Sequence, residues 1–450
     1  MSVPTKTALP SSPPRRPALR WDIVEEHLEE AAFLWTQWEQ ALDSHEHVLA
    51  EVVGGEEWRL RAHLEGLDIA GPAAAKRLLL PVLESEERGL LCAAAHVLLA
   101  SREPGAAQAV WGRLVDGPED AGRALLRAAA LSERVGVDRE LLAVMSRLKP
   151  GLRPAVLEAL GARGAKVTGA LRDLTVEDGP ERWAAALHIA PFAERSVAGA
   201  WIQKGLHGEG GVLDAAVRTG LVLGMRSAGL RCRQLAEAGA PEAGLSLLAL
   251  AVGGEPADLQ CVVRALDAPN LRDAAVWALG FSGQPVAAEA VLRVLRETGG
   301  WLAADAFAAI TGMPLEVGAT GPEAKESDGL DEDEEESLAS SGALLPPAGP
   351  PGTWDGLAVE AWWKHERTRF ESGRRFLRGH PWTPEAALTG LLHEPMHRRP
   401  VLAWELSVRT GGAFWLNTRA WAWRQVRMLA ALRPQALAAV PRSFPSFITR

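Results

Sequence analysis

The sequence predicts an all-α protein whose middle is an α-solenoid, a curved stack of helical hairpins. Alanine, leucine, arginine and glutamate dominate long stretches and tyrosine is absent, as is typical of helical proteins. Residues 71–312 alternate apolar runs with short glycine or proline breaks. In addition, residues 271–283 (LRDAAVWALGFSG) match residues 152–164 (LRPAVLEALGARG) at seven of thirteen positions. The two stretches lie 119 residues apart, close to four units of about 30 residues.

Apolar side chains in this repeated stretch recur at intervals of three and four residues, which predicts a helix with one apolar face. Small residues such as Ala275 and Ala278 would let a second helix approach closely, and we expect Gly280 and Gly283 to end the helix in a left-handed turn. A single hairpin cannot bury its apolar face alone. Residues 71–313 are therefore predicted to stack about eight hairpins into a right-handed curved array.

The residues before this array are predicted to form a tail and a helical cap. Residues 1–20 are rich in proline and serine and are predicted to be disordered. Residues 21–70 are predicted to form an N-terminal helical cap. Its first helix covers about residues 21–42, with Asp22 as the expected capping residue, and its second helix is expected to end at Gly71.

The residues after the array change in composition. Residues 314–352 combine a dense acidic run with a proline cluster and are predicted to be a flexible linker. Residues 353–450 are basic and hold eight of the seventeen tryptophans, so we expect a smaller helical segment. The predicted helices of this segment cover residues 355–371, 384–392, 400–409 and 418–432.

The net charge of −9 is unevenly distributed along the chain. Residues 22–66 carry −10, residues 323–336 carry −8, and residues 352–450 carry +8. The helical middle has no sustained basic stripe, which argues against non-specific binding of duplex DNA. Two interpretations of the charge pattern stay open: the acidic regions fold back on the basic end, or each meets an outside partner.

Several features predict a cytoplasmic protein. No window holds 18 consecutive apolar residues, so no membrane span is expected, and residues 1–20 lack the apolar run of a secretion signal. Cys92, Cys232 and Cys261 lie far apart in apolar contexts, and we expect buried free thiols, consistent with a reducing compartment.

One stretch resembles the H-E-x-x-H motif of zinc proteases. In that motif two histidines one helical turn apart bind zinc and the glutamate activates water. Here His393 and His397 have the required spacing, but Pro395 between them opposes a continuous helix. These histidines are therefore only weak metal candidates. We predict no metal, no cofactor and no catalytic residue, since phosphate loops, dinucleotide fingerprints and nucleophile elbows are also absent from the sequence.

The best candidates for partner binding are Trp362, Trp363, Arg367, Arg374 and Arg375. Such a basic aromatic run can stack bases or grip a phosphate, or it can form an amphipathic helix whose aromatic side chains enter a core. We favour the core interpretation. The two adjacent tryptophans cannot share one helix face, so at least one of them packs against another element or lies exposed.

Several blocks in one order carry a family resemblance: EEAAFLWTQW, LRAHLEGLDIAG, VRTGLVLGMRSAG, LRDAAVWALGFSG with AFAAITG, and WW with RRFLRG. Together they resemble an uncharacterised bacterial family of HEAT-repeat-like proteins that are often encoded near type VI secretion genes. The resemblance covers about residues 22–432 without the linker. It implies HEAT-like hairpins and an accessory role in a secretion apparatus, such as binding an effector or a spike component. The family has no established activity, so it implies no functional residues.

The sequence therefore predicts a non-enzymatic scaffold or adaptor that holds a protein partner in the concave groove of the solenoid. One alternative is an enzyme built on a HEAT-like scaffold, which requires a pocket with converging ionisable groups. Another is binding of single-stranded nucleic acid through the C-terminal tryptophans and arginines.

Overall fold

The computed structural model describes residues 19–175, 178–253, 255–320 and 344–432, and these residues form an all-α fold, as predicted. Strands in this described part are limited to two antiparallel pairs of two residues each. No helix in it is long and apolar enough to cross a membrane. Most of the predicted tail and residues 321–343 of the predicted linker lie outside the described residues. The strand pairs are β1 (Ala319–Thr320) with β2 (Thr353–Trp354), and β3 (Phe376–Leu377) with β4 (His380–Pro381).

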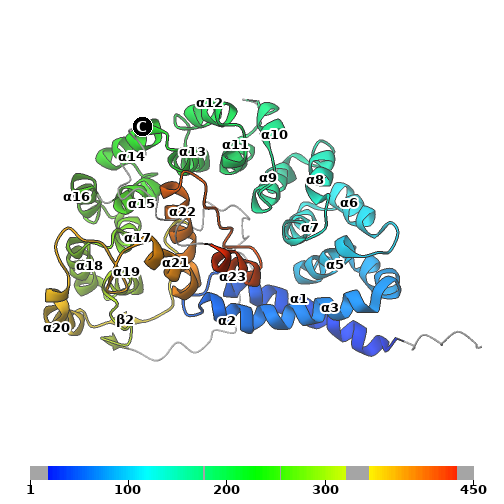
Figure 1. The fold of residues 1–450 in the computed structure, drawn as a ribbon, viewed down its shortest axis with the longest axis horizontal. Helices are drawn as coiled ribbons and strands as arrows, with labels where there is room; N and C mark the ends of the chain where they lie inside the picture. The colour runs from blue at the N-terminus through cyan, green and yellow to red at the C-terminus, as the bar shows by residue number, and fades with distance from the viewer. Residues whose placement is uncertain (1–18, 176–177, 254, 321–343, 433–450) are drawn as a thin grey trace, which may run out of the picture.

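The helices follow an arc with an inner and an outer layer (Figure 1). Each inner helix packs against the next inner helix along the chain, and an outer helix connects the two. The inner helices are α5 (Arg88–Ala100), α7 (Glu119–Leu131), α9 (Arg153–Ala162), α11 (Pro180–Ile189), α13 (Gly210–Val222), α15 (Gly244–Gly253), α17 (Arg272–Ser282) and α19 (Trp301–Thr311). The outer helices are α6 (Ala106–Asp116), α8 (Val137–Met145), α10 (Thr168–Arg172), α12 (Arg195–Gly205), α14 (Arg226–Ala238), α16 (Pro256–Ala265) and α18 (Pro285–Thr298).

Burial differs between the layers because an inner helix is covered on more sides. In α17 every residue from Ala275 to Ser282 is buried, whereas the outer helix α16 buries a single stripe that includes Leu259 and Val262. This difference explains why the inner helices read as nearly continuous apolar runs.

The repeated sequence stretch forms equivalent helices. It corresponds to α9 and α17, which are separated by four successive steps along the inner layer. Gly283 ends α17 in the left-handed conformation with φ of 67°, as predicted. Gly280 instead lies inside α17, so the prediction that it ends the helix is wrong. A Cβ atom at Gly280 would lie 2.9 Å from the Cα atom of Ala306, so this glycine allows α19 to pack closely.

The N-terminal helices form one end of the arc, where α1 (Trp21–Ala41) packs on α3 (Glu56–Ala74) and α5. Asp22 is not the cap of α1, because Arg20 holds the capping position and binds the Asp22 carboxylate with an Nη2–Oδ2 distance of 2.6 Å. At Gly71 the chain kinks, with φ of 66°, and then continues as helix. The remaining elements here are α2 (Leu49–Gly54), a π-helical turn (Ala75–Leu79) and α4 (Leu80–Val82).

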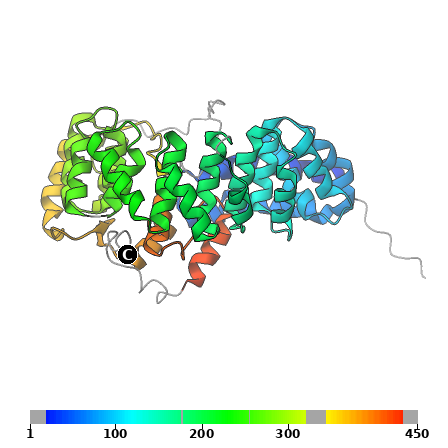
Figure 2. The same cartoon turned by 90° about the horizontal axis from the view of Figure 1, so that it is seen from above.

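Of the C-terminal helices, α21 to α23 lie on the concave side of the arc (Figure 1) and gather toward one of its long edges (Figure 2), whereas α20 lies outside the arc beside α18. α20 packs on α18, α22 packs on α13, and α23 reaches α2 at the other end of the molecule. The chain thereby connects both ends of its own arc. The bounds are α20 (Gly356–Glu366), α21 (Pro384–His393), α22 (Arg399–Arg409) and α23 (Ala422–Ala431).

The two described ends of the predicted linker contact different parts of the chain, the first β2, which follows the linker, and the second the arc. Before the undescribed residues, β1 pairs with β2, and after them the carbonyl oxygen of Leu344 accepts a hydrogen bond from Trp277 Nε1 at 2.9 Å. Cys92, Cys232 and Cys261 are buried free thiols, as predicted.

Candidate functional site

The C-terminal segment, which we define as residues 353–432, follows the carboxyl ends of the inner helices. Its backbone amides donate to carbonyl oxygens there: Phe376 to Gly283 at 2.7 Å, and Arg378 to Ala309 at 2.8 Å. The last four carbonyl groups of a helix lack partners within that helix. The C-terminal segment supplies such partners at several helices in turn.

Side chains of this segment extend the same pattern. Arginine, tryptophan and asparagine all donate to carbonyl oxygens in or just after the last turns of inner helices. Cations are also favoured at this negative end of a helix. Positive side chains of the C-terminal segment therefore bind helix ends of the same chain. The donors and acceptors are Arg375 to Phe281, Arg409 to Val252, Trp404 to Arg218, Asn417 to Ala162 and Trp421 to Leu131.

Buried ion pairs reinforce this contact beside α17 and α19. Glu405, which is 1% exposed, accepts hydrogen bonds from Arg375 Nη1 and Arg409 Nε, both at 2.7 Å. Arg398 and Asp305 are each 1% exposed and lie 2.5 Å apart between Nη1 and Oδ2. Breaking such buried pairs is costly. The Arg398–Asp305 pair joins the segment to α19, whereas Glu405 holds together two arginines of the segment that themselves bind carbonyl oxygens of the arc.

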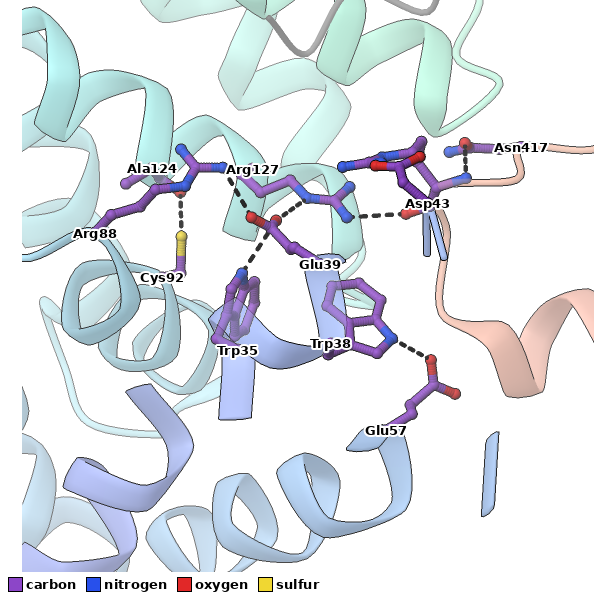
Figure 3. Close-up of polar contacts among 11 residues, drawn as sticks. Trp35, Trp38, Glu39, Asp43, Glu57, Arg88, Cys92, Ala124, Arg127 and Asn417 are labelled. Carbon is purple, nitrogen blue, oxygen red and sulfur yellow. Dashed lines mark hydrogen bonds and ion pairs between the residues drawn. The ribbon is translucent and has the colours of Figure 1, made fainter. Parts of the chain in front are cut away.

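At the other end of the arc, two buried carboxylates of the N-terminal helices, Glu57 and Glu39, lie close to the segment (Figure 3); Glu57 binds it directly and Glu39 acts through Arg127. Glu57 is fully buried and accepts hydrogen bonds from Trp38 Nε1 at 2.9 Å and from the backbone amide of Trp423 at 2.7 Å. It also accepts from the amide of Ala422, the first residue of α23. A carboxylate at the amino end of a helix satisfies free amides and the helix dipole. Burial nevertheless raises the pKa of Glu57, against the lowering effect of these amides.

The second carboxylate is Glu39, which binds Arg127 Nε at 2.7 Å and Arg88 Nη2 at 3.0 Å. Arg127 in turn donates from Nη2 to the carbonyl oxygen of Arg419 at 3.0 Å. Burial alone would raise the pKa of Glu39, but the charges of Arg127 and Arg88 lower it to about 2. Asp43 of the acidic N-terminal region forms an ion pair with Arg419, so part of that region meets the basic end within the same chain. The acidic stretch 323–336 lies outside the described residues.

The predicted partner-binding residues are divided between two environments. Trp363 is buried, with its ring centre 5.0 Å from that of Phe370, and Arg367 lies beside it at 5.6 Å from the ring centre. Arg367 also binds Glu289 of α18 at 2.7 Å between Nε and Oε1.

Of the other three candidates, Trp362 adjoins this pair, because the ring centre of Phe307 also lies 5.5 Å from that of Trp363. Arg374 and Arg375 lie elsewhere. Trp362 is partly buried, with its ring centre 6.2 Å from that of Phe307. Arg374 is largely exposed and binds Glu371 at 3.1 Å, and Arg375 is directed toward the carboxyl end of α17. Their role in partner binding stays a prediction.

The two weak metal candidates do not share a helix. α21 ends at His393, Glu394 is extended, and His397 lies in a separate 3-10 turn, which confirms the expected effect of Pro395. His397 is buried, and its Nε2 atom lies 3.5 Å from Asp305 Oδ2. Among the described residues, no group of three or more His, Cys, Asp or Glu side chains is placed to hold a metal ion.

A cavity of about 110 Å³ lies between the inner helices and the C-terminal segment. The arc contributes Phe192 and the C-terminal segment contributes Trp404 and Trp415 to its apolar wall. The ring centres of Phe192 and Trp415 lie 5.0 Å apart. The cavity is thus built from both parts of the chain and depends on their contact.

Four ionisable side chains of the arc line this cavity at regular spacing. Arg127, Glu158, His188 and Arg218 come from the successive inner helices α7, α9, α11 and α13. They are separated by 31, 30 and 30 residues in the sequence. Equivalent positions on stacked helices lie in a row. The structure therefore aligns one ionisable group from each helix along the concave side.

Burial shifts the pKa values of this row. Burial raises the pKa of Glu158 to about 7, against the lowering effect of Arg123. Burial, followed by the charge of Arg218, lowers the pKa of His188 to about 3, so its imidazole is neutral at pH 7. His188 is 7% exposed, and neither of its buried ring nitrogens has a hydrogen-bond partner among the described residues. Buried polar atoms without partners are uncommon and call for an explanation.

We expect Glu158→Gln to change how stability depends on pH. A carboxyl whose pKa is higher in the folded state destabilises the fold as pH rises from its unfolded value near 4.5 through 7. The variant should therefore match the wild type at pH 4 and exceed its free energy of unfolding by up to about 3 kcal/mol at pH 8. Urea unfolding at pH 4, 6 and 8 measures this, with the exposed Glu237→Gln of α14 as control. A difference that does not change with pH would contradict the environment described for Glu158.

A wider groove of about 1070 Å³ adjoins this row at the amino ends of α9, α11 and α13. Glu158 and His188 line both the groove and the cavity. The groove also presents Arg153 at the start of α9 and Glu181 at the start of α11, so its surface carries both signs of charge. Its lining contains no residue of the C-terminal segment. The concave side is thus covered along the carboxyl ends of the inner helices, while this groove lies at their amino ends.

Sequence reasoning predicted a concave groove but identified none of the residues that line this one, and it did not predict the cavity, although the spacing of the four ionisable residues is visible in the sequence. In each of the four helices α7, α9, α11 and α13, a charged or histidine side chain interrupts an apolar run, as in LLRAAA, VLEALG, ALHIAP and AVRTGL. No protein-family model matches this chain, and no curated protein matches it in sequence. The site therefore has to be interpreted from its own geometry.

Proposed function

We propose that the protein is a non-catalytic binding scaffold, a HEAT-like α-solenoid that holds a segment of a protein partner. The observation that carries this proposal is the groove at the amino ends of α9, α11 and α13. The chain fills the opposite edge of the concave side with its own C-terminal segment, so the groove is where a partner would be recognised. Curved helical stacks commonly bind peptides or helices on their inner surface.

The lining of the groove indicates the kind of partner. Arg153 and Glu181 begin neighbouring helices, and the Nε atoms of Arg123 and Arg153 are buried without a hydrogen-bond partner among the described residues. A polar segment with charges of both signs would satisfy these groups, and complementary charge sets specificity. The family resemblance makes a component or effector of a type VI secretion apparatus the first candidate.

Affinity capture with the full chain tests the proposal. The groove variant is Arg153→Glu with Glu181→Arg, which exchanges the two signs and keeps the net charge. The matched control is Arg139→Glu with Glu237→Arg, on the exposed faces of the outer helices α8 and α14. We expect the wild type and the control to capture the same protein, and the groove variant to bind it at least tenfold more weakly when the purified partner is titrated.

Two outcomes would overturn the proposal. If the wild type enriches no protein over empty resin, the scaffold function fails. If all three baits bind the partner equally, the groove is not the site. A chain truncated at Gly312 is a poorer bait, because it removes the arginine that pairs with the buried Asp305 and the amides bound by the buried Glu57.

A further inference from the structure

The cavity between the inner helices and the C-terminal segment has the properties of a small-molecule site, and it adjoins the groove through Glu158 and His188, which line both. Its volume of about 110 Å³ is comparable to the ~150 Å³ engineered cavity that binds benzene. A ligand with one aromatic ring and a small substituent fits this size. Pockets of this kind combine apolar walls with a few well-placed polar groups.

The walls favour a flat apolar body. Trp404, Trp415 and Phe192 line the cavity, and the last two already meet edge to face. Aromatic rings prefer such offset or edge-to-face neighbours at 4.5 to 7 Å between centres. A third ring between the arc and the C-terminal segment would add contacts to both.

The polar lining favours a negative substituent. Arg127, Arg218 and Arg419 place three positive charges around the cavity, and arginine binds carboxylates with paired hydrogen bonds. Two of these arginines also bind carboxylates of the chain, Arg127 to Glu39 and Arg419 to Asp43. Arg218 lies in the same lining, and burial lowers its pKa to about 10, so it stays charged at pH 7.

His188 and Glu158 complete the polar lining. The neutral imidazole of His188 offers one donor and one acceptor, and both are buried without a partner among the described residues. Because the pKa of Glu158 is about 7, its carboxyl can be neutral beside an anion and can donate a hydrogen bond to it. The one carboxyl of the arc that lines this cavity therefore does not exclude a negatively charged ligand.

We propose that this cavity binds a small aromatic carboxylate, whose ring lies among Trp404, Trp415 and Phe192 and whose carboxylate is bound by His188 and the arginines. The ligand would contact the inner helices and the C-terminal segment at once. Its binding therefore stabilises the closed arrangement of the two.

Titration of the full-length protein with benzoate tests the proposal. Binding is measured by isothermal titration calorimetry and by the change in tryptophan fluorescence. We expect saturable binding of one benzoate per chain. Benzylamine, which has a similar size and the opposite charge, should bind at least tenfold more weakly, because it would meet the arginines with like charge.

Two cavity variants and one control locate the binding. His188→Leu removes the unpartnered nitrogens, and Ala130→Leu fills the cavity from α7. Each should weaken benzoate binding at least tenfold. His207→Leu, at an exposed position after α12, should leave it unchanged. Two variants are used so that misfolding of one does not end the test, and far-UV circular dichroism checks the fold of each.

Three results would overturn the proposal: no saturable benzoate binding by the wild type, equal binding of benzylamine, or binding unchanged in both folded cavity variants. None of these results depends on a protein partner. The proposal for the cavity and the proposal for the groove can therefore be confirmed or overturned independently.

Discussion

Replacing Glu405 with alanine should lower the free energy of unfolding by about 3 to 5 kcal/mol, the usual cost of removing one partner from a buried ion pair. Glu405 neutralises two arginines, Arg375 and Arg409, and its side chain is 2% exposed. Arg409 has a side chain that is 1% exposed, so it cannot turn to water when the carboxylate is lost. Both arginines also hold carbonyl oxygens of the arc, and these contacts should loosen with them.

Urea unfolding of the full chain at pH 7 measures this effect. Glu371→Ala is the matched control, because Glu371 binds only Arg374 at the surface, with a side chain that is 69% exposed. Exposed pairs contribute about 0 to 1 kcal/mol, so this control should change little. Equal effects of the two substitutions would show that Glu405 does not hold the segment in the way the geometry implies.

Glu39→Gln should produce the second large effect, and it should depend on pH. A carboxyl whose pKa is lowered from 4.5 to about 2 in the folded state contributes stability above pH 4.5, and this contribution is lost as pH falls through 2. Its size at pH 7 is on the order of 3 kcal/mol. The variant should therefore be less stable than the wild type by about this amount at neutral pH, and the difference should shrink below pH 5.

Unfolding by urea at pH 7, 5 and 3 gives this difference directly. Glu46→Gln provides the control, since Glu46 is an exposed carboxylate in the turn after α1. Other buried carboxylates titrate equally in both proteins and cancel in the comparison. If the difference between Glu39→Gln and the wild type stays constant over this range, Arg127 and Arg88 do not hold Glu39 ionised.

Helix positions could be predicted from the sequence because they depend on local spacing. α1, α21 and α22 lie within one or two residues of their predicted ranges, and Gly283 ends α17 as expected. Gly280 shows the limit of such reasoning. Its absent side chain serves a close contact with Ala306 of another helix, which no local pattern reveals.

The basic C-terminal segment could be predicted as helical, but the surface that it packs against could not be predicted. A cluster of arginines has the same sequence signature whether it meets an outside partner or the carbonyl ends of helices in its own chain. Arg375 was a reasonable partner-binding candidate, and the structure places its guanidinium against Phe281 and Glu405. The direction of a side chain depends on tertiary packing, which spacing alone does not determine.

The row of ionisable residues that lines the cavity could be predicted only in part. The interval of 30 to 31 residues from Arg127 to Arg218 could have been read from the sequence, since it equals the repeat length. What the sequence could not show is that the C-terminal segment covers these groups. In this cavity His188 is buried, and burial raises the pKa of Glu158.

The contact between Glu57 and α23 also constrains how the chain folds during synthesis. The amides that Glu57 binds belong to residues made 365 and 366 positions later. At ribosomal rates of 5 to 20 residues per second, this separation corresponds to roughly 20 to 70 s. During that interval the ring of Trp38 cannot yet pack against Trp421, whose ring centre lies 4.6 Å from it in the folded protein. The first helices to be made are therefore among the last to complete their packing, and a nascent chain exposes them until nearly all of it has emerged.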